Sequence, residues 1–480
     1  MTTESVAFKA NRTFGTGKEL FIVALAVSVT TLAVNDSYFL VFAVCVGLGV
    51  AALIRFDFYV YGLVILLPWY PLLDVRPPFR DLFLFLRFGL LAAVWMIRRR
   101  QGKPFAEWIW GNRLKRGALL FAAVATASLL LGGSSNIDAY RSLIRLYSYL
   151  AVFFAMSGWL ENRRQLITII KLLLASTIAV ALFGFYQVLE DGYTSFYFHL
   201  YPAQEEGMPP WSGRIPSILF HFNNLAAYLN LVLPFALACM TFPRDRALRI
   251  GGFLSHTMAG AALYFTGSRG GLLAYGGMLL IAIWYLTPKR KALFSIILSS
   301  LLAAALVLSM QGGSGGGRLQ EVDDFTQESR LVLWGAAVMM FSSHPILGVG
   351  YGNSPPLYNA YLGSNGTEAL HAHNMYLQFL AETGVVGFLV FCVLMIAFAR
   401  MALKLARQPD PFVRLVGVGV GGALATTLIH GLVDYPFNAN PQFGALFWLV
   451  LALGMLTFQD VHKTSALPPA NDEQAEGWQY

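Results

Sequence analysis

Charged residues are scarce in this chain, and their scarcity decides the class of protein. Of the 480 residues, 12% are Asp, Glu, Lys or Arg, whereas 56% are hydrophobic. Because a soluble globular protein carries about 25% charged residues, the composition excludes an ordinary soluble domain. The low charge is accompanied by repeated long apolar runs, which indicate a protein embedded in lipid.

Cysteine is also scarce, and strand-like alternation of polarity is missing from the apolar runs. The three cysteines, Cys45, Cys239 and Cys392, are far apart in sequence, so they provide neither metal-site spacing nor a disulfide framework. Continuous apolar runs exclude a membrane β-barrel. They favour helices, which satisfy their own backbone polar groups inside lipid.

We therefore predict an all-α bundle of about 12–14 transmembrane spans, since one span needs about 20 mostly apolar residues. The candidate spans lie at 20–34, 38–54, 57–74, 82–97, 117–132, 143–159, 166–187, 217–242, 250–267, 270–287, 293–309, 384–405, 413–433 and 442–458. The expected segments are an N-terminal segment (1–19), a bundle (20–309), a large loop (310–383), C-terminal spans (384–458) and a tail (459–480). No cleavable signal is expected, because the first run lacks a small-residue cleavage site.

Basic residues predict the orientation in the membrane. Five clusters fall on one side of the fourteen-span topology, at 98–103, 163–164, 244–249, 289–291 and 400–407. Positively charged loops stay in the cytoplasm. Both termini are therefore expected in the cytoplasm and the 310–383 loop on the periplasmic face of a bacterial inner membrane. The net charge of +8 is explained by this topology, without nucleic acid as a partner.

Arginines on the outer face are the first candidates for chemistry. Arg214, Arg269 and Arg330 lie there against the expected charge bias. A guanidinium group matches pairs of phosphate oxygens and stays charged, so three converging arginines predict a diphosphate-binding clamp. Arg87, deep in an apolar run, either reaches the same phosphates or has a buried structural partner. A single arginine can also snorkel or form a surface ion pair.

Histidines near the end of the long loop are the second candidates. His373 suits deprotonation of an acceptor hydroxyl. Together with His371 it could instead bind a metal, but no close carboxylate completes such a site in the sequence, and we expect no metal. Asp434, at the outer end of a late span, either orients a histidine or arginine or forms a structural pair. His221 is interpreted as a hydrogen-bonding residue between helices.

Four ordered motifs carry a family resemblance. They are Arg214 followed by Phe222-Asn223-Asn224; Gly267-Ser268-Arg269-Gly270; Ser329-Arg330 and Trp334 followed by His344-Pro345-Ile346-Leu347-Gly348-Val349-Gly350; and His373-Asn374 followed after nine residues by Gly384-x-x-Gly387. In this order they resemble the bacterial O-antigen ligase and O-antigen polymerase superfamily, which includes certain protein O-oligosaccharyltransferases. The resemblance covers about residues 180–440, although the family commonly has Asn-Pro-Asn where this chain has Asn223-Asn224.

The resemblance implies a helical, GT-C-like membrane glycosyltransferase that inverts configuration and needs no metal or cofactor. Such enzymes take a glycan from undecaprenyl diphosphate and pass it to a hydroxyl of lipid A-core, a glycan or a protein. By this resemblance His373 corresponds to the essential histidine, Arg269 and Arg330 to essential arginines, and Arg214 to a supporting arginine. We expect supporting roles for three further residues, namely His371, Asn374 and Asp434.

Three functions remain open at this point. Ligation of a finished glycan, as in lipopolysaccharide biosynthesis, is slightly favoured over polymerisation, but the two reactions share these residues. The third is a transporter or flippase for a lipid-linked glycan. That class often shows inverted repeats, and none is recognisable in this sequence.

Overall fold

The computed structural model describes residues 56–69, 82–132, 136–189, 214–219, 221–243, 245–286, 296–297, 300, 325–362, 371–437 and 441–466. Within these ranges the regular structure is entirely helical, without a strand, which confirms the predicted all-α class. The chain divides into two compact units, Met1–Leu66 and Leu67–Tyr480. The expected spans at 20–34 and 38–54, and the start of the large loop, lie outside the described residues.

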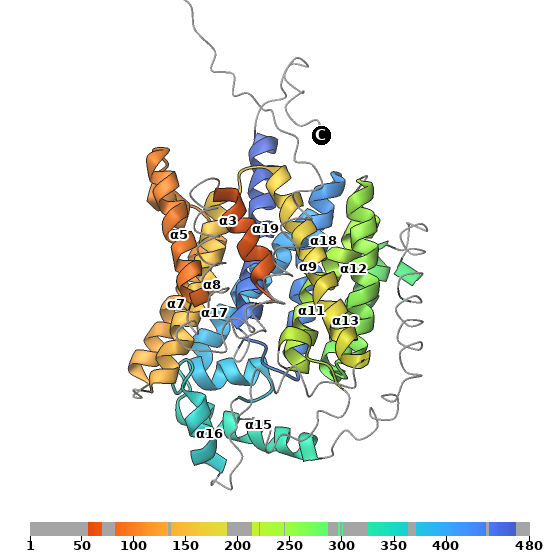
Figure 1. The fold of residues 1–480 in the computed structure, drawn as a ribbon. Helices are drawn as coiled ribbons and strands as arrows, with labels where there is room; N and C mark the ends of the chain where they lie inside the picture. Colours follow the sequence, from red (N-terminus) through yellow and green to blue (C-terminus); the bar gives the residue numbers. More distant parts are fainter. Residues whose placement is uncertain are drawn as a thin grey trace, which may run out of the picture. The chain divides into compact units, whose positions relative to one another are not determined.

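In the first unit the described helix is α3 (Phe56–Leu66). The second unit begins with α5 (Leu82–Arg100), α6 (Phe105–Trp110), α7 (Arg113–Leu131), α8 (Ile137–Trp159) and α9 (Arg163–Leu189). It continues with η3 (Ser217–Leu219), α11 (Phe222–Thr241), α12 (Arg246–Phe265), α13 (Arg269–Leu286), α15 (Phe325–Ser343), α16 (Ser354–Leu362), α17 (Met375–Ala406), α18 (Pro411–His430) and α19 (Pro441–Ala466) (Figure 1).

Six of the described helices are long and apolar enough to cross a membrane: α7, α9, α11, α17, α18 and α19. Their length and composition support a membrane protein, as the hydropathy of the sequence predicts. The total of 12–14 spans stays a prediction, because several expected spans lie outside the described ranges.

The second unit has two distinct ends. Arg98, Lys103, Arg163, Arg400 and Lys404 line one cavity, so three of the five basic clusters gather there, and we call this the basic end. The other end is covered by α15 and α16, at the bottom of Figure 1, and we call it the capped end. The long helix α17 runs from the capped end to the basic end.

Short side chains pack α15 and α16 against the start of α17. Seven buried residues form this cluster: Ala336, Ala337, Met340, Val349, Tyr358, Ala372 and Ala381. The apolar helix expected over residues 330–340 is therefore α15. The expected 310–383 loop is a packed, largely helical cap in its described part, and α17 begins nine residues before the predicted boundary.

The helix break in α17 falls at that boundary. Gly384 has a φ of 61° and a ψ of −169°, which interrupts the helix. A break frees backbone carbonyls before it and amides after it. The turn at 345–350 satisfies these groups through Val349 N to Ala381 O (2.9 Å), Gly350 N to Glu382 O (3.1 Å), Val385 N to Pro345 O (2.8 Å) and Val386 N to Ile346 O (3.2 Å).

Two glycines allow the 345–350 turn to pack directly against the break in α17, and we call this contact the joint. Gly348 has a φ of +72°, and a Cβ there would lie 2.3 Å from the backbone carbon of Glu382. A Cβ on Gly384 would lie 2.3 Å from the carbonyl oxygen of Ile346. Only glycine adopts such a φ without cost and permits such an approach. Two glycine motifs that are separate in the sequence thus form one joint, which holds the capped end to α17.

Candidate active site

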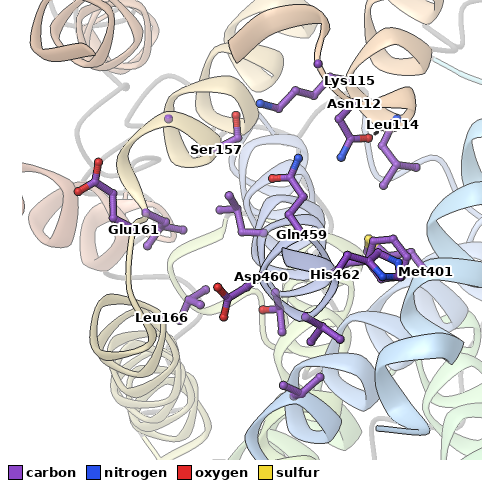
Figure 2. A pocket seen from close by; sticks show the side chains of 18 of the residues that line it. Asn112, Leu114, Lys115, Ser157, Glu161, Leu166, Met401, Gln459, Asp460 and His462 are labelled. Carbon is purple, nitrogen blue, oxygen red and sulfur yellow. Dashed lines mark hydrogen bonds between the residues drawn. The ribbon is translucent and has the colours of Figure 1, made fainter. Parts of the chain in front are cut away.

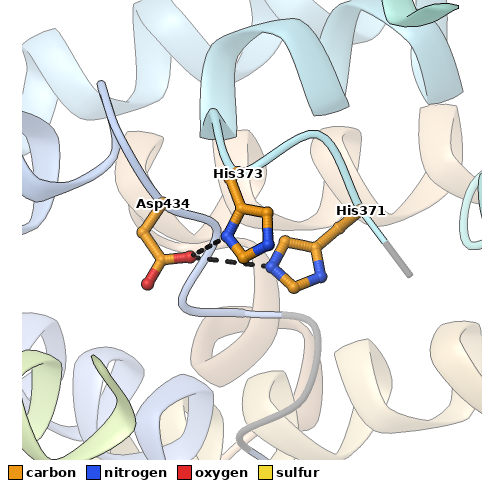
Figure 3. A group of neighbouring side chains, drawn as sticks. All are labelled: His371, His373 and Asp434. Atoms are coloured by element: carbon orange, nitrogen blue, oxygen red, sulfur yellow. Dashed lines mark hydrogen bonds and ion pairs between the residues drawn. The ribbon is translucent and has the colours of Figure 1, made fainter. Parts of the chain in front are cut away.

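Two histidines and one carboxylate meet at the capped end (Figure 3). Asp434 Oδ1 lies 3.2 Å from His373 Nδ1 and 3.6 Å from His371 Nε2. The two imidazole rings are 4.1 Å apart between centroids. His371 and His373 precede α17, whereas Asp434 follows α18, so this group joins two segments about sixty residues apart in sequence.

Hydrogen bonds hold the segment that carries both histidines. The residue between them, Ala372, donates its backbone N–H to Gln378 Oε1 at 2.9 Å. Asn374 caps α17 by accepting from the backbone N–H of Tyr376 and of Leu377, each at 3.0 Å. Its Nδ2 also donates to Leu432 O at 2.9 Å, which ties the segment to the end of α18. Asn374 is therefore a positioning residue.

The buried side chain of Glu382 forms hydrogen bonds that support the same region. Glu382 is 2% exposed, and its Oε1 accepts hydrogen bonds from Ser354 Oγ at 2.8 Å and Gln378 Nε2 at 2.7 Å. Because Gln378 also holds Ala372, this network connects the joint in α17 to the two histidines. Neither Gln378 nor Glu382 was predicted from the sequence, since a lone Gln and a lone Glu in an apolar helix do not reveal their partners.

The charge of Asp434 is stabilised where it lies. Burial works to raise the pKa of Asp434, but hydrogen bonds from His371 and His373 outweigh it and hold the pKa well below its usual range. Burial lowers the pKa of His371, against the effect of Asp434. A third histidine, His430, is 1% exposed and has Nε2 3.9 Å from Asp434 Oδ2. At neutral pH the group is thus an anionic carboxylate among imidazoles.

Arg214 is fixed beside the turn that precedes α13. Its Nε donates to Thr266 O and its Nη2 to Gly267 O, both at 2.9 Å. Its guanidinium carbon lies 3.3 Å from the centroid of the Phe222 ring. The guanidinium group is therefore held by two backbone carbonyls and one aromatic ring.

Arg214 lies within electrostatic reach of both Arg330 and Arg269. Burial, then the positive charge of Arg330 and then that of Arg269 together lower the pKa of Arg214 to about 10. Arg330 also contributes to the lowered pKa of His371. The three arginines come from segments that are far apart in sequence, and Arg330 lies within electrostatic reach of the histidine group.

The local fold of two motifs explains where Arg269 lies. Ser268 Oγ donates to Asn223 Oδ1 at 2.8 Å and accepts from Gly271 N at 3.2 Å, so it links the first turn of α11 to that of α13. Arg269 is the first residue of α13 and is exposed. The Ser-Arg-Gly element therefore docks on the Phe-Asn-Asn element and presents Arg269 at the surface of the capped end.

His221 belongs to this region as well, and the interpretation of it as a residue between helices is incomplete. Its Nδ1 caps α11 by accepting from Asn223 N at 3.1 Å. Burial lowers the pKa of His221 to about 4, with Asp434 acting in the opposite direction and His373 and Arg214 in the same one. His221 thus lies between the arginines and the Asp434 group as a neutral ring. In the sequence, its position just before an apolar run was the one feature that could have indicated a helix-capping role.

Arg87 has a different environment. It is 2% exposed, donates from Nη1 to Ser148 Oγ at 3.2 Å and lies 5.7 Å from the centroid of the Tyr149 ring. Both partners are on α8. These contacts match the buried structural partner that the sequence left open, and they do not support the predicted part of Arg87 in binding diphosphate.

The sequence places no carboxylate near the two histidines, but the fold brings Asp434 to them, in agreement with the alternative that Asp434 orients a histidine. Donor atoms of His371, His373 and Asp434 all lie within 4.8 Å of one another. Two imidazoles and one carboxylate are a ligand set that divalent transition metals use. The same geometry suits an Asp–His hydrogen bond, because a His373 N–H can donate directly to Asp434. The arrangement therefore fits either a proton acceptor held by Asp434 or a cation site.

Comparison with known proteins finds one family model that matches part of this chain. The family model described as O-Antigen ligase matches residues 254–392. That stretch includes Arg269, Arg330 and His373, whereas Arg214 and Asp434 lie outside it. Among the curated proteins, none matches the chain. The predicted resemblance to the O-antigen ligase and polymerase superfamily is confirmed by this match, and members of the matched family are glycosyltransferase-like enzymes.

Proposed function

We propose that this membrane protein, which resembles the O-antigen ligases, transfers a glycan from undecaprenyl diphosphate to an acceptor hydroxyl. The observation that carries the proposal is the presence, at the capped end, of Arg214 within electrostatic reach of Arg269 and Arg330, and of a histidine paired with a buried carboxylate, His373 with Asp434. The family match supports glycosyl transfer in general. The chemistry of these five side chains supports the kind of donor and the catalytic step.

The arginines suit a diphosphate leaving group. When the sugar leaves its donor, the bond between its anomeric carbon and the phosphate oxygen breaks, and negative charge grows on the diphosphate. Arg214, Arg269 and Arg330 would stabilise that charge, because preorganised donors are most effective where charge develops. Arg214 is already oriented by two carbonyls and a ring, so it needs little rearrangement when the donor binds.

His373 suits deprotonation of the acceptor. An ionised Asp434 can only accept a hydrogen bond, so His373 Nδ1 must be the donor. A neutral imidazole then has its lone pair on Nε2, which would take the proton of the acceptor hydroxyl as the new glycosidic bond forms. Asp434 fixes the tautomer and stabilises the imidazolium, as the aspartate does in a Ser–His–Asp triad.

The charge of the two ends supports the orientation in the membrane. Loops rich in Lys and Arg stay in the cytoplasm, so the basic end would face the cytoplasm of a bacterial inner membrane. The capped end, with the candidate active site, would then face the periplasm, and both termini would be cytoplasmic. Exposed apolar residues of α15, such as Leu331 and Val332, are consistent with a helix that lies at the membrane surface.

We propose that the reaction uses no metal and inverts the configuration of the sugar. The donor is already activated by its diphosphate, and the arginines supply the positive charge. A chelator tests this directly. Transfer by the purified protein should survive EDTA; strong inhibition that Mg²⁺ or Zn²⁺ reverses would assign His371, His373 and Asp434 to a metal instead.

The decisive experiment is reconstitution of the purified chain with a labelled undecaprenyl-diphosphate glycan and separate candidate acceptors, namely lipid A-core, a second lipid-linked glycan and a protein. Transfer to lipid A-core or protein defines a ligase, and chain growth on a second donor defines a polymerase. A glycan profile of a deletion strain separates the two independently: loss of a ligase leaves free lipid-linked polymer, whereas loss of a polymerase leaves single repeats. Movement of intact donor across the membrane without transfer would favour a flippase.

A further inference from the structure

A large cavity lies at the basic end, at the far end of α17 from His373 (Figure 2). Its volume is about 1420 Å³, and its walls are the neighbouring ends of α5, α6, α7, α8, α9, α17, α18 and α19. None of the candidate active-site residues lines it. An inference about this cavity is therefore independent of the proposed glycan transfer.

The walls of the cavity carry excess positive charge. Lys103 pairs with Glu161 at 2.5 Å and Arg163 with Asp410 at 3.1 Å, and both pairs are partly exposed. The remaining lining cations are Arg98, Arg113, Lys115, Arg400 and Lys404, and the remaining lining acids are Glu107 and Asp460. The five cations thus exceed the two acids by three charges, so the cavity suits an anion.

Lys115 is the most distinctive of these cations. It is 4% exposed, and its Nζ donates to Trp108 O at 2.6 Å. That is the only hydrogen bond from this ammonium group to a described residue, although the group has three N–H donors. A buried charge with unfilled donors is costly unless an anion joins it. Figure 2 shows Lys115 beside Asn112 on the wall that α7 forms.

Arg98, near the end of α5, lies close enough to Lys115 to act on its charge. Its guanidinium carbon is 5.4 Å from the centroid of the Trp108 ring, and its Nη1 donates to Gly158 O at 3.3 Å. Its Nε is buried and has no hydrogen-bond partner among the described residues. Trp108 therefore holds two cations, one on its ring and one on its carbonyl, and both retain unfilled donors.

The remaining walls are apolar or carry helix N-termini. Leu114, Leu166, Met401 and Phe412 line the cavity beside the cations. The helices α7, α9 and α18 all begin at this cavity, and a helix N-terminus favours negative charge. An occupant with a phosphate group and an adjoining hydrocarbon portion would satisfy the cationic and the apolar walls together.

We propose that this cavity binds the phosphodiester headgroup of an anionic membrane phospholipid. The phosphate lies among Lys115, Arg98 and the exposed Arg400, and the upper part of the acyl chains lies on the apolar wall. Basic pockets between helix ends on the cytoplasmic side are a known setting for such headgroups. A zwitterionic phospholipid carries its own ammonium group and suits the excess positive charge less well.

Native mass spectrometry of the full-length protein in detergent tests the proposal, with phosphatidylglycerol and phosphatidylcholine as the probes. The test variants are Lys115→Gln on the buried wall and Arg400→Gln on the exposed wall. Arg116→Gln is the matched control, because Arg116 is exposed on the same turn of α7, does not line the cavity and loses the same charge. Comparing the two lipids within each variant removes effects on folding.

The wild type should bind phosphatidylglycerol more tightly than phosphatidylcholine. Each cavity variant should weaken phosphatidylglycerol binding by about fivefold and leave phosphatidylcholine unchanged, as expected for one Lys or Arg beside an anionic headgroup. Equal binding of the two lipids by the wild type, or an equal loss in Arg116→Gln, would overturn the proposal. So would displacement of phosphatidylglycerol by millimolar inorganic phosphate, since the cavity would then be a site for a free anion.

Discussion

The capped end and the basic end both gather cationic side chains, but Lys103 and Arg163 at the basic end are held differently from Arg214 at the capped end. At the basic end, Lys103 and Arg163 are paired with carboxylates and are 41% and 40% exposed. At the capped end, Arg214 is held by backbone carbonyls and an aromatic ring. Asp434, a buried carboxylate there, is bound by histidines. A guanidinium group whose charge is not neutralised by the protein remains able to bind a phosphate.

The largest expected effect concerns the histidine group. His373→Ala should lower the rate of glycan transfer by about 10²–10⁴, the usual contribution of a general base. His344→Ala is the matched control, because His344 is exposed at the same end and its ring nitrogen Nδ1 contacts Ser343 Oγ at 3.0 Å. The measurement is transfer of labelled glycan by reconstituted protein. Near-normal transfer by His373→Ala would remove His373 from the reaction.

Loss of an arginine at the capped end should have the second-largest effect on the rate of glycan transfer. Arg269→Ala and Arg330→Ala should each slow transfer by about 10²–10³, by analogy with removal of one oxyanion donor. Arg141→Ala serves as the control, since Arg141 is exposed on α8 and forms a 2.7 Å ion pair with Asp138. The same assay applies, at saturating donor. If the control Arg141→Ala loses as much activity as Arg269→Ala and Arg330→Ala, transfer depends only on the total positive charge of the capped end. The proposal of a specific diphosphate clamp would then be wrong.

The joint between the 345–350 turn and α17 should affect the stability of the protein rather than the catalytic step. Gly348→Ala should destabilise the protein by about 3 kcal/mol, because a positive φ and contact with the backbone of Glu382 both oppose a Cβ. Gly335→Ala on α15 is the control: a Cβ there meets nothing within 4 Å, and alanine favours the helix. Thermal unfolding in detergent measures both. Equal unfolding midpoints would show that the joint can shift without cost.

His221, at the capped end, should make the free energy of unfolding depend on pH. Its pKa is about 4 in the folded protein, against 6.5 for a free histidine, so the unfolded chain binds the extra proton between these values. Stability should therefore fall as pH drops below about 6.5, by about 2 kcal/mol at pH 5. Asn is also an effective N-cap, so His221→Asn should keep the α11 cap without titrating.

Unfolding at pH 7.5 and pH 5 measures this difference. The wild type and His221→Asn should be similar at pH 7.5, and the variant should lose less stability at pH 5. An equal loss in both proteins would assign the acid sensitivity to other groups.

The smallest effect is expected at the basic end. Arg163→Gln removes a partly exposed ion pair with Asp410, which should cost no more than about 1 kcal/mol in unfolding and leave transfer intact. The measurement is the same unfolding experiment together with the transfer assay. A large loss of transfer would mean that the two ends are coupled, and the contrast between them would disappear.

The candidate site could be predicted from the sequence only in part. Arg214, Arg269, Arg330 and His373 were recognisable because charged and titratable residues are rare in an apolar chain and stand in ordered motifs. The partner of His373 was not recognisable. Asp434 lies 61 residues away, and from the sequence it could equally orient a histidine, orient an arginine or form a structural pair. The contribution of His221 was hidden for the same reason.

The amino-acid sequence by itself determined the helical class, the membrane setting and the identity of most candidate residues, because hydropathy and composition are properties of short segments. Only the tertiary structure decided which side chains meet. It joined His373 to Asp434, brought Arg87 to Ser148 and closed two distant glycine motifs into one joint. Such pairings depend on how helices pack across long sequence separations, and a local pattern carries no record of that packing.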